Sequence, residues 1–167
     1  PAKGQRAEAD VIRYNQETGK TLLIGNASFR DSTRNIAGAE IRYDQKNKIY
    51  QLAGRGKVID GSNTIEADSL DFNDVLGNGV AIGNVVWHDT ASHYTILAYR
   101  MDYNKQSQYL NAFGEYGAKG AGGRPLMKTP MDNDTLYMAA DTLNAWKPDS
   151  LSDTRLLSAH RDVRIFK

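Results

Sequence analysis

Hydrophobic and polar positions along the chain form a pattern that recurs about every thirty residues. Each copy has an apolar residue, an aromatic residue two positions later, and a glycine eleven positions after the aromatic residue. A fixed spacing of the same residue classes indicates a protein built from stacked structural repeats. A weaker fifth copy carries Leu143 and Ala145, with Ala159 in place of the glycine. The four clear copies are Ile12, Tyr14 and Gly25; Ile41, Tyr43 and Gly54; Leu70, Phe72 and Gly83; and Met101, Tyr103 and Gly114.

Apolar and polar residues alternate within each copy, and this period of two predicts β-strands. Leu23, Gly25, Ala27 and Phe29 occupy every other position of one such stretch. Alternate side chains of a strand point to the same face, so each set forms one side of a sheet. Turn-forming residues separate the stretches, as at 15–19, and no stretch shows the spacing of an amphipathic helix. We therefore expect an all-β protein of about five stacked units of roughly 30 residues.

The alternation slips once in each repeat, which predicts a bend. Ile36 and Ile41 are five positions apart, and so are Ile65 and Leu70. An odd offset cannot keep both residues on one face of a straight strand, so a bulge or corner must lie between them. Stacked bends predict a sheet folded into a trough. The small residues expected at the corners are Gly38, Ala67, Ala98 and Ala140.

The repeats extend over residues 9–167 of the 167-residue chain, which we interpret as a single domain preceded by a flexible lead-in at 1–8. Glycine and proline are concentrated at 117–134, and we expect this segment to be a loop inserted on one face of the stack. Residues 1–9 are polar and do not have the pattern of a signal peptide. No apolar stretch is long enough for a membrane-spanning helix.

Composition and charge exclude several function classes. The net charge is +1, so no overall field attracts nucleic acid. The chain has no cysteine, which removes disulfides, thiol catalysis and cysteine-ligated zinc. The three histidines, of which His88 and His93 lie close in sequence, lack the spacing of a metal site. We expect no catalytic residues, no metal and no cofactor.

Acidic residues recur at the predicted turns, and two readings of them are open. Paired carboxylates carry out glycoside cleavage, and aspartate also starts or closes turns. We favour the turn role because these residues coincide with the other turn signals. They are Asp60, Asp68, Asp71 and Asp74.

Several segments resemble the OstA-like (organic-solvent-tolerance) family. They are 63–72 (NTIEADSLDF), 135–143 (TLYMAADTL), 25–27 (GNA) and 83–85 (GNV). The family includes the periplasmic bridge protein of lipopolysaccharide transport and the periplasmic domain of the outer-membrane translocon. The resemblance implies a folded β-jellyroll, also called a β-taco, that holds acyl chains between its two sheets. It also implies a periplasmic location, with outer-membrane association as a further expectation.

The same resemblance implies the ligand and the partners. We expect lipopolysaccharide or lipid A to be bound and passed across the periplasm by a non-enzymatic conduit. Other OstA-like jellyroll domains are expected as partners through end-to-end pairing of edge strands, with an outer-membrane translocon as a further partner. Exposed hydrocarbon is unfavourable in water by about 0.8 kcal/mol per CH₂, and an apolar trough removes that penalty. The predicted lipid-binding residues are Ile12, Leu23, Phe29, Ile36, Ile41, Leu52, Val58, Ile65, Leu70, Ala81, Trp87, Ile96, Met101 and Ala112.

Two alternatives to a lipid conduit are compatible with the repeat. One is a structural or adhesive β-solenoid with a dry core, because apolar residues on one face of a sheet are usually plain core. The other is a carbohydrate-active β-helix enzyme using the aspartates. Frequent small residues, such as Gly25, Ala27, Gly54 and Gly83, favour a groove with room for a guest.

Overall fold

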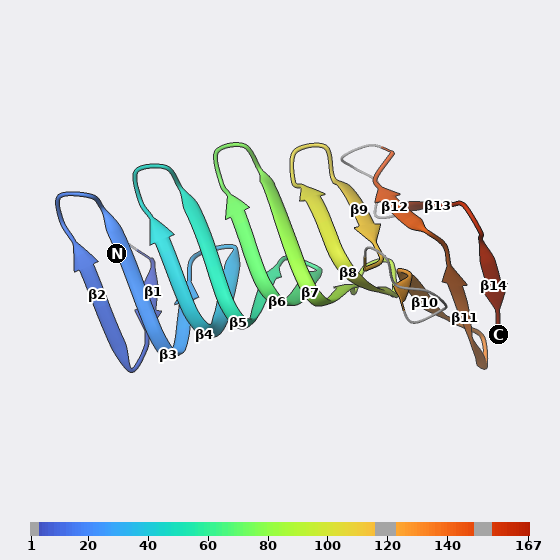
Figure 1. Ribbon diagram of the computed structural model, residues 1–167, viewed down its shortest axis with the longest axis horizontal. Helices are drawn as coiled ribbons and strands as arrows, with labels where there is room; N and C mark the ends of the chain where they lie inside the picture. Colours follow the sequence, from blue (N-terminus) through green and yellow to red (C-terminus); the bar gives the residue numbers. More distant parts are fainter. Residues whose placement is uncertain (1–3, 116–122, 149–154) are drawn as a thin grey trace.

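The computed structural model describes residues 4–115, 123–148 and 155–167, and in these residues the protein is all-β. Fourteen strands of the described residues form one antiparallel sheet. Figure 1 shows the strands side by side along the longest axis, with the two termini at opposite ends. The expected fold class is confirmed. In the described part of the chain, no helix is long and apolar enough to cross a membrane.

Six long strands form the centre of the sheet, and eight short ones form its ends. The long strands are β3 (Lys20–Arg30), β4 (Arg34–Asp44), β5 (Ile49–Asp60), β6 (Asn63–Asn73), β7 (Asn78–Asp89) and β8 (Tyr94–Asn104). The short strands are β1 (Arg6–Glu8), β2 (Val11–Asn15), β9 (Tyr109–Phe113), β10 (Leu126–Met131), β11 (Asp134–Ala139), β12 (Thr142–Trp146), β13 (Leu156–His160) and β14 (Arg164–Phe166).

The short strands act in pairs as the two halves of a folded strand. β1 and β2 pair with opposite halves of β3, and β9 and β10 pair with opposite halves of β8. β11 and β12 pair in turn with β10 and β9, while β14 and β13 pair with β11 and β12. Each of the five expected units therefore corresponds to two folded strands. We call the side of the sheet that contains β2, β9, β12 and β13 the first arm, and the side that contains β1, β10, β11 and β14 the second arm; β3–β8 run through both.

The bend between the arms is a break in strand pairing at the same height in every long strand. The pairing of β3 with β4 shifts between Ile24 and Ala27, and that of β6 with β7 shifts between Glu66 and Ser69. Corresponding shifts occur in the other long pairs. Three of the corners expected from sequence, Gly38, Ala67 and Ala98, lie at or beside these breaks.

Alternate folded strands turn the corner with two consecutive left-handed residues. Gly83 and Asn84 have φ of 79° and 48°, and Gly25–Asn26 and Gly54–Arg55 repeat this conformation. Glycine adopts a positive φ without the steric penalty that a Cβ brings. The Asn84 Nδ2 donates a hydrogen bond to the Asp68 carboxylate at 2.7 Å, which fixes the corner from the neighbouring strand.

The fifth copy bends two residues later than the sequence pattern indicates. Its left-handed pair is Arg161–Asp162, with φ of 63° and 42°, and Ala159 instead lies in β13. The Asp141 N–H donates to the Arg161 carbonyl at 3.1 Å, just as the Asp10 N–H donates to the Gly25 carbonyl at 2.9 Å. The repeat is therefore intact in backbone geometry where its sequence signature is lost.

Two predicted boundaries differ from the structure. Residues 126–131, inside the expected loop insert at 117–134, form β10 and complete the second arm beside β8. Residues 117–122 of that insert lie outside the described residues. Within the expected lead-in at 1–8, Arg6–Glu8 forms β1 and pairs with β3. In both places few apolar residues alternate, so the local pattern does not predict a strand. These segments become strands because the edges of β3 and β8 offer backbone groups with which they can form hydrogen bonds.

Two rows of apolar side chains run across the whole sheet, one on each arm, and apart from the exposed Ile12 and Ile165 at the ends they pack against each other as a single core. Neighbours in each row are direct cross-strand partners, the contacts that stabilise a sheet. On the first arm the row is Ile12, Leu23, Ile41, Leu52, Leu70, Ala81, Met101, Ala112, Leu143 and Ala159. On the second arm it is Ala7, Phe29, Ile36, Val58, Ile65, Trp87, Ile96, Met127, Met138 and Ile165.

The corner geometry predicts an unequal response to alanine at two glycines with positive φ. A Cβ on Gly83 would lie 2.6 Å from an Asp68 carboxylate oxygen, whereas a Cβ on Gly61 would meet nothing within 4 Å. We expect Gly83→Ala to lower the free energy of unfolding by about 3 kcal/mol and Gly61→Ala by about 1 kcal/mol. Urea unfolding followed by circular dichroism measures both. Equal losses for the two variants would contradict a corner held by close packing.

Candidate functional site

Every predicted lipid-binding residue lies on one of the two core rows. Eleven of them are buried, while Val58 and Ile65 are half-buried and pack against the core. Ile12 is the exception: it is 51% exposed, because it lies in β2, which pairs with β3 alone. The alternating sequence pattern therefore identifies the inner face of the fold correctly.

A cavity of about 80 Å³ lies between the arms in the middle of the stack. Both arms line it, with Leu52 and Ala81 on one side and Trp87 on the other. Its walls are mainly apolar, as a site for hydrocarbon requires. The other predicted residues at the cavity are Ile36, Val58, Ile65, Leu70 and Met101, whereas Ile12, Leu23, Phe29, Ile41, Ile96 and Ala112 are not among its lining residues.

Aromatic side chains occur on both sides of the cavity along the stack. On the N-terminal side, Phe29 of the second arm lies 5.5 Å from Tyr50 of the first, and Tyr50 stacks on Tyr43 at 4.3 Å between ring centroids. On the C-terminal side, Trp87 meets Tyr94 edge-on at 5.4 Å. The Phe29–Tyr50 contact joins the two arms, whereas Trp87 and Tyr94 both lie on the second arm.

A third row of side chains lies on the first arm, nearer the open side of the fold, and was not among the lipid-binding residues predicted from the sequence. Tyr50, Phe72, Gly79, Tyr103 and Leu110 are successive cross-strand partners, and all of them line the cavity. The signal was present in the repeat itself, because Phe72 and Tyr103 follow Leu70 and Met101 by two positions and so share their face. Gly79 provides space here, since a Cβ would lie 2.8 Å from the Phe72 ring.

Ion pairs connect the two arms across the open side of the fold. We call this side the mouth; it lies between the turns of the first arm and the strand ends of the second. Asp60, at the end of β5, pairs with Lys105 in the turn after β8 at 2.6 Å. Asp89, at the end of β7, pairs with Arg155 just before β13 at 3.0 Å. Asp31, Asp60 and Asp89 are 29 residues apart, so the repeat itself supplies an acid at this edge.

Arg155 is the most deeply buried of the cations at the mouth. Its side chain is fully buried, and it donates to Asp89, to the Gln108 carbonyl and to the Gln108 side chain. Its guanidinium also lies 5.1 Å from the centre of the Trp87 ring. Burial works to raise the pKa of Asp89, but hydrogen bonds from the Ala91 N–H and from Arg155 lower it below the ordinary value. Both charges are therefore satisfied inside the fold.

Arg34, at the start of β4 on the second arm, lies at the mouth beside the cavity. It pairs with Asp31 on its own arm at 2.8 Å and with Asp74, in the turn after β6, at 2.5 Å. Its guanidinium lies 5.0 Å from the ring centre of Tyr50 and 5.9 Å from that of Phe72. Burial works to raise the pKa of Asp31, while hydrogen bonds from Thr33 and Arg34 lower it to about 2.

The other candidate residues do not gather into a reactive site. His88 contacts the Thr95 hydroxyl through Nδ1 at 3.0 Å. In the described residues, no group of three metal-ligating side chains comes together. Of the four recurring aspartates, Asp60 and Asp74 bridge the mouth, Asp68 holds a corner, and Asp71 accepts a hydrogen bond from Gln51 at 2.9 Å.

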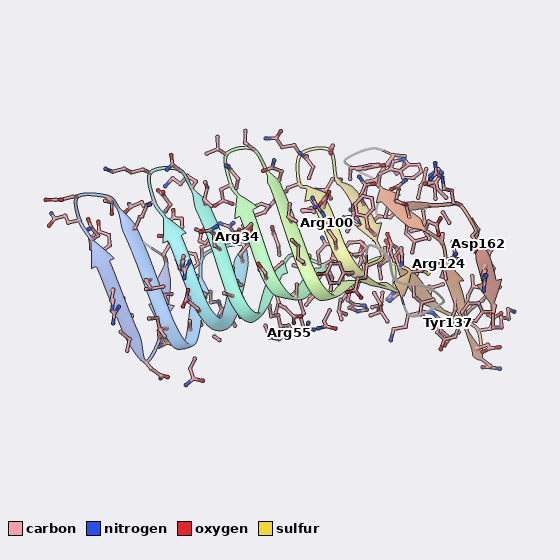
Figure 2. All side chains as sticks on the ribbon, in the orientation of Figure 1. Arg34, Arg55, Arg100, Arg124, Tyr137 and Asp162 are labelled. Atoms are coloured by element: carbon pink, nitrogen blue, oxygen red, sulfur yellow. The ribbon has the colours of Figure 1, made fainter. Side chains whose placement is uncertain are left out.

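Both ends of the sheet have strands with one unpaired edge. β2 is exposed along its length and carries Val11, Ile12 and Tyr14. β14 is likewise exposed, with Ile165 and Phe166. Figure 2 shows Arg124, Tyr137 and Asp162 at the C-terminal end, where Arg124 pairs with Asp162 at 2.5 Å. Unpaired edges of this kind accept another strand.

Comparisons with known proteins agree with this architecture. Residues 2–49 match the family model described as LptA/(LptD N-terminal domain) LPS transport protein. The fold is similar to that of LptH from Pseudomonas aeruginosa, described as the LptA homologous periplasmic component of the conserved lipopolysaccharide transport device. That comparison has a TM-score of 0.64 at 14% identity, and it covers 76% of this chain and 95% of that chain. No curated protein sequence matches.

The fold is that of an LptA-like β-jellyroll. More particularly, these findings support the LptA/LptD N-terminal family, and the predicted resemblance to OstA-like proteins is confirmed. This is a family of non-enzymatic transport proteins, which agrees with the prediction that the chain is not an enzyme.

The lowered pKa values at the mouth predict acid sensitivity. A carboxyl group whose pKa is lower in the folded state stabilises the fold above its unfolded pKa, and that stability is lost as the pH falls through the folded value. For Asp31 this range extends from 3.8 down to about 2. We expect the urea midpoint to fall between about pH 5 and about pH 2.5, and to fall less in Asp31→Asn. An identical fall in both proteins would show that Asp31 does not contribute.

Proposed function

We propose that this protein binds the acyl chains of lipopolysaccharide between its two arms and passes the lipid across the periplasm. The carrying observation is the pair of continuous apolar rows, which run through all five units and enclose a cavity. The family match and the similarity to LptH support lipopolysaccharide as the ligand and the periplasm as the location. The fourteen residues predicted from sequence are proposed as the lipid-contacting set, together with Tyr50, Phe72 and Tyr103.

The arms must move apart for a lipid to enter. The enclosed space of about 80 Å³ is well below the roughly 300–1,000 Å³ of typical ligand sites. Backbone hydrogen bonds run between neighbouring strands within each arm, whereas away from the bend the arms meet through side chains. A guest chain can therefore replace contacts between the arms without breaking the sheet. Each CH₂ it buries is worth about 0.8 kcal/mol, which offsets the loss of those contacts.

Continuity from one molecule to the next would follow from the exposed ends. β1 and β2 at one end, and β13 and β14 at the other, have backbone groups free for a further strand. The apolar rows reach these edges at Ile12 and Ile165, which are 51% and 60% exposed. Pairing with another OstA-like jellyroll domain, or with the matching part of an outer-membrane translocon, would cover these residues and join the two grooves.

The dry β-solenoid is the second candidate, and the tight packing of the last unit is what favours it. Ala140, Leu143 and Ala145 are fully buried there. Ion pairs across the mouth and a cavity beside them are not features that a purely structural stack requires. The groove is therefore the better account of units two to four, where the cavity lies.

Photo-cross-linking at adjacent positions of β5 tests the proposal. Leu52 is buried at the cavity, while Gln51 is exposed on the opposite face of the same strand. We expect a photoreactive amino acid at position 52 to cross-link to purified lipopolysaccharide, and the same group at position 51 to give at least about tenfold less. Equal yields at both positions, or none at either, would contradict binding between the arms.

A further inference from the structure

The Arg34 guanidinium is shared by two carboxylates that hold it from opposite arms. Asp31 and Asp74 leave one positive charge facing two negative ones at the border of an apolar cavity. The Arg34 side chain is nine-tenths buried, and its Nε has no hydrogen-bond partner. The guanidinium is therefore incompletely satisfied in this structure.

The two carboxylates are not held equally. Asp31 also accepts hydrogen bonds from the N–H groups of Thr33 and Arg34 and from the Thr33 hydroxyl. Among the described residues, the Asp74 carboxylate accepts bonds from Arg34 alone. Asp74 is also the more exposed of the two, at 28% against 12%, and it lies in a turn whose tip exposes Val75 and Leu76. Asp74 is thus the partner that an incoming anion can displace.

We propose that Arg34 is an exchangeable anion site at the mouth, where the phosphate of an amphiphilic guest replaces the Asp74 carboxylate while the acyl chain enters the cavity. Guanidinium binds phosphate through the same two-pronged geometry that it uses for carboxylate. Releasing Asp74 also removes a link between the arms, so binding of the headgroup and opening of the mouth occur together. Asp31 stays bound and keeps Arg34 in place.

The inference rests on the proposed function, since it names the residue that selects anionic guests for the same groove. Lys105–Asp60 and Arg155–Asp89 also bridge the mouth, with the acid on the second arm and the cation on the first, and Asp60 also lines the cavity. Arg155 is fully buried and donates hydrogen bonds to three acceptor groups, so we expect it to remain a fixed connection between the arms. Arg34 is the cation that combines an Nε donor without a hydrogen-bond partner, a carboxylate partner that an anion can displace (Asp74), and contact with the cavity.

Two ligands that differ only in the headgroup provide the test. Lysophosphatidic acid carries a phosphate monoester, and a monoacylglycerol of the same acyl chain is neutral. Isothermal titration calorimetry of the chain with each should show tighter binding of the phosphate ligand by about tenfold. Arg34→Gln should abolish that preference and leave monoacylglycerol binding within about twofold. Asp74→Asn should strengthen phosphate binding by about threefold, because the competing carboxylate is gone.

A matched control separates the mouth from general surface charge. Arg100 pairs with Asp102 at 2.9 Å on the outer face of the first arm, and Arg100→Gln should keep the full preference. Failure of both ligands to bind the native chain would contradict the proposed acyl-chain binding itself. Equal binding of both ligands, or an unchanged preference in Arg34→Gln, would overturn the anion site and leave the groove standing. If Arg34→Gln does not fold, weaker phosphate binding in Asp74→Asn would overturn it as well.

Discussion

The left-handed bend repeated in the folded strands is the constraint on which the rest of this structure depends. Glycine followed by a second left-handed residue breaks the strand pairing at one height in β3, β5 and β7, and Arg161–Asp162 adopts the same conformation in the fifth copy. The two halves of every strand then face each other, and a sheet that would otherwise expose one apolar face covers it with its own second half. The core rows, the cavity and the mouth all follow from that geometry.

Within this architecture the bonds along the stack and the bonds across it differ in kind. Backbone hydrogen bonds hold neighbouring strands together within each arm, and they are strong, numerous and independent of any guest. Away from the bend, the arms are held to each other by apolar and aromatic side chains and by ion pairs at the mouth, such as Arg155–Asp89. Contacts of the second kind are exchangeable, because acyl chains replace apolar contacts and anions replace carboxylates. A sheet held by fixed backbone hydrogen bonds, with side-chain contacts at the mouth that a guest can replace, suits a carrier.

The inner face could be predicted from sequence because it follows from local alternation combined with the repeat. All fourteen proposed residues lie on the two rows, since a period of two and a bend of fixed position determine the side on which each residue lies. The mouth could not be predicted, because Arg34–Asp74 and Arg155–Asp89 join residues 40 and 66 positions apart whose approach depends on the folding of the sheet. The strand at 126–131 was missed because glycine and proline precede it, and its pairing with β8 comes from the free edge there rather than from its own pattern.

The central claim is that the mouth opens when a lipid binds, and a distance across it tests this most directly. The chain has no cysteine, so spin labels on cysteines introduced at Ser32 and Val75 report only the gap between the second-arm edge and the first-arm turn. A pair at Lys46 and Val75, both in first-arm turns, is the matched control. Double electron–electron resonance should show the 32–75 distance lengthening when lipopolysaccharide is added, with the 46–75 distance unchanged. An unchanged 32–75 distance in the lipid-saturated protein would contradict the account.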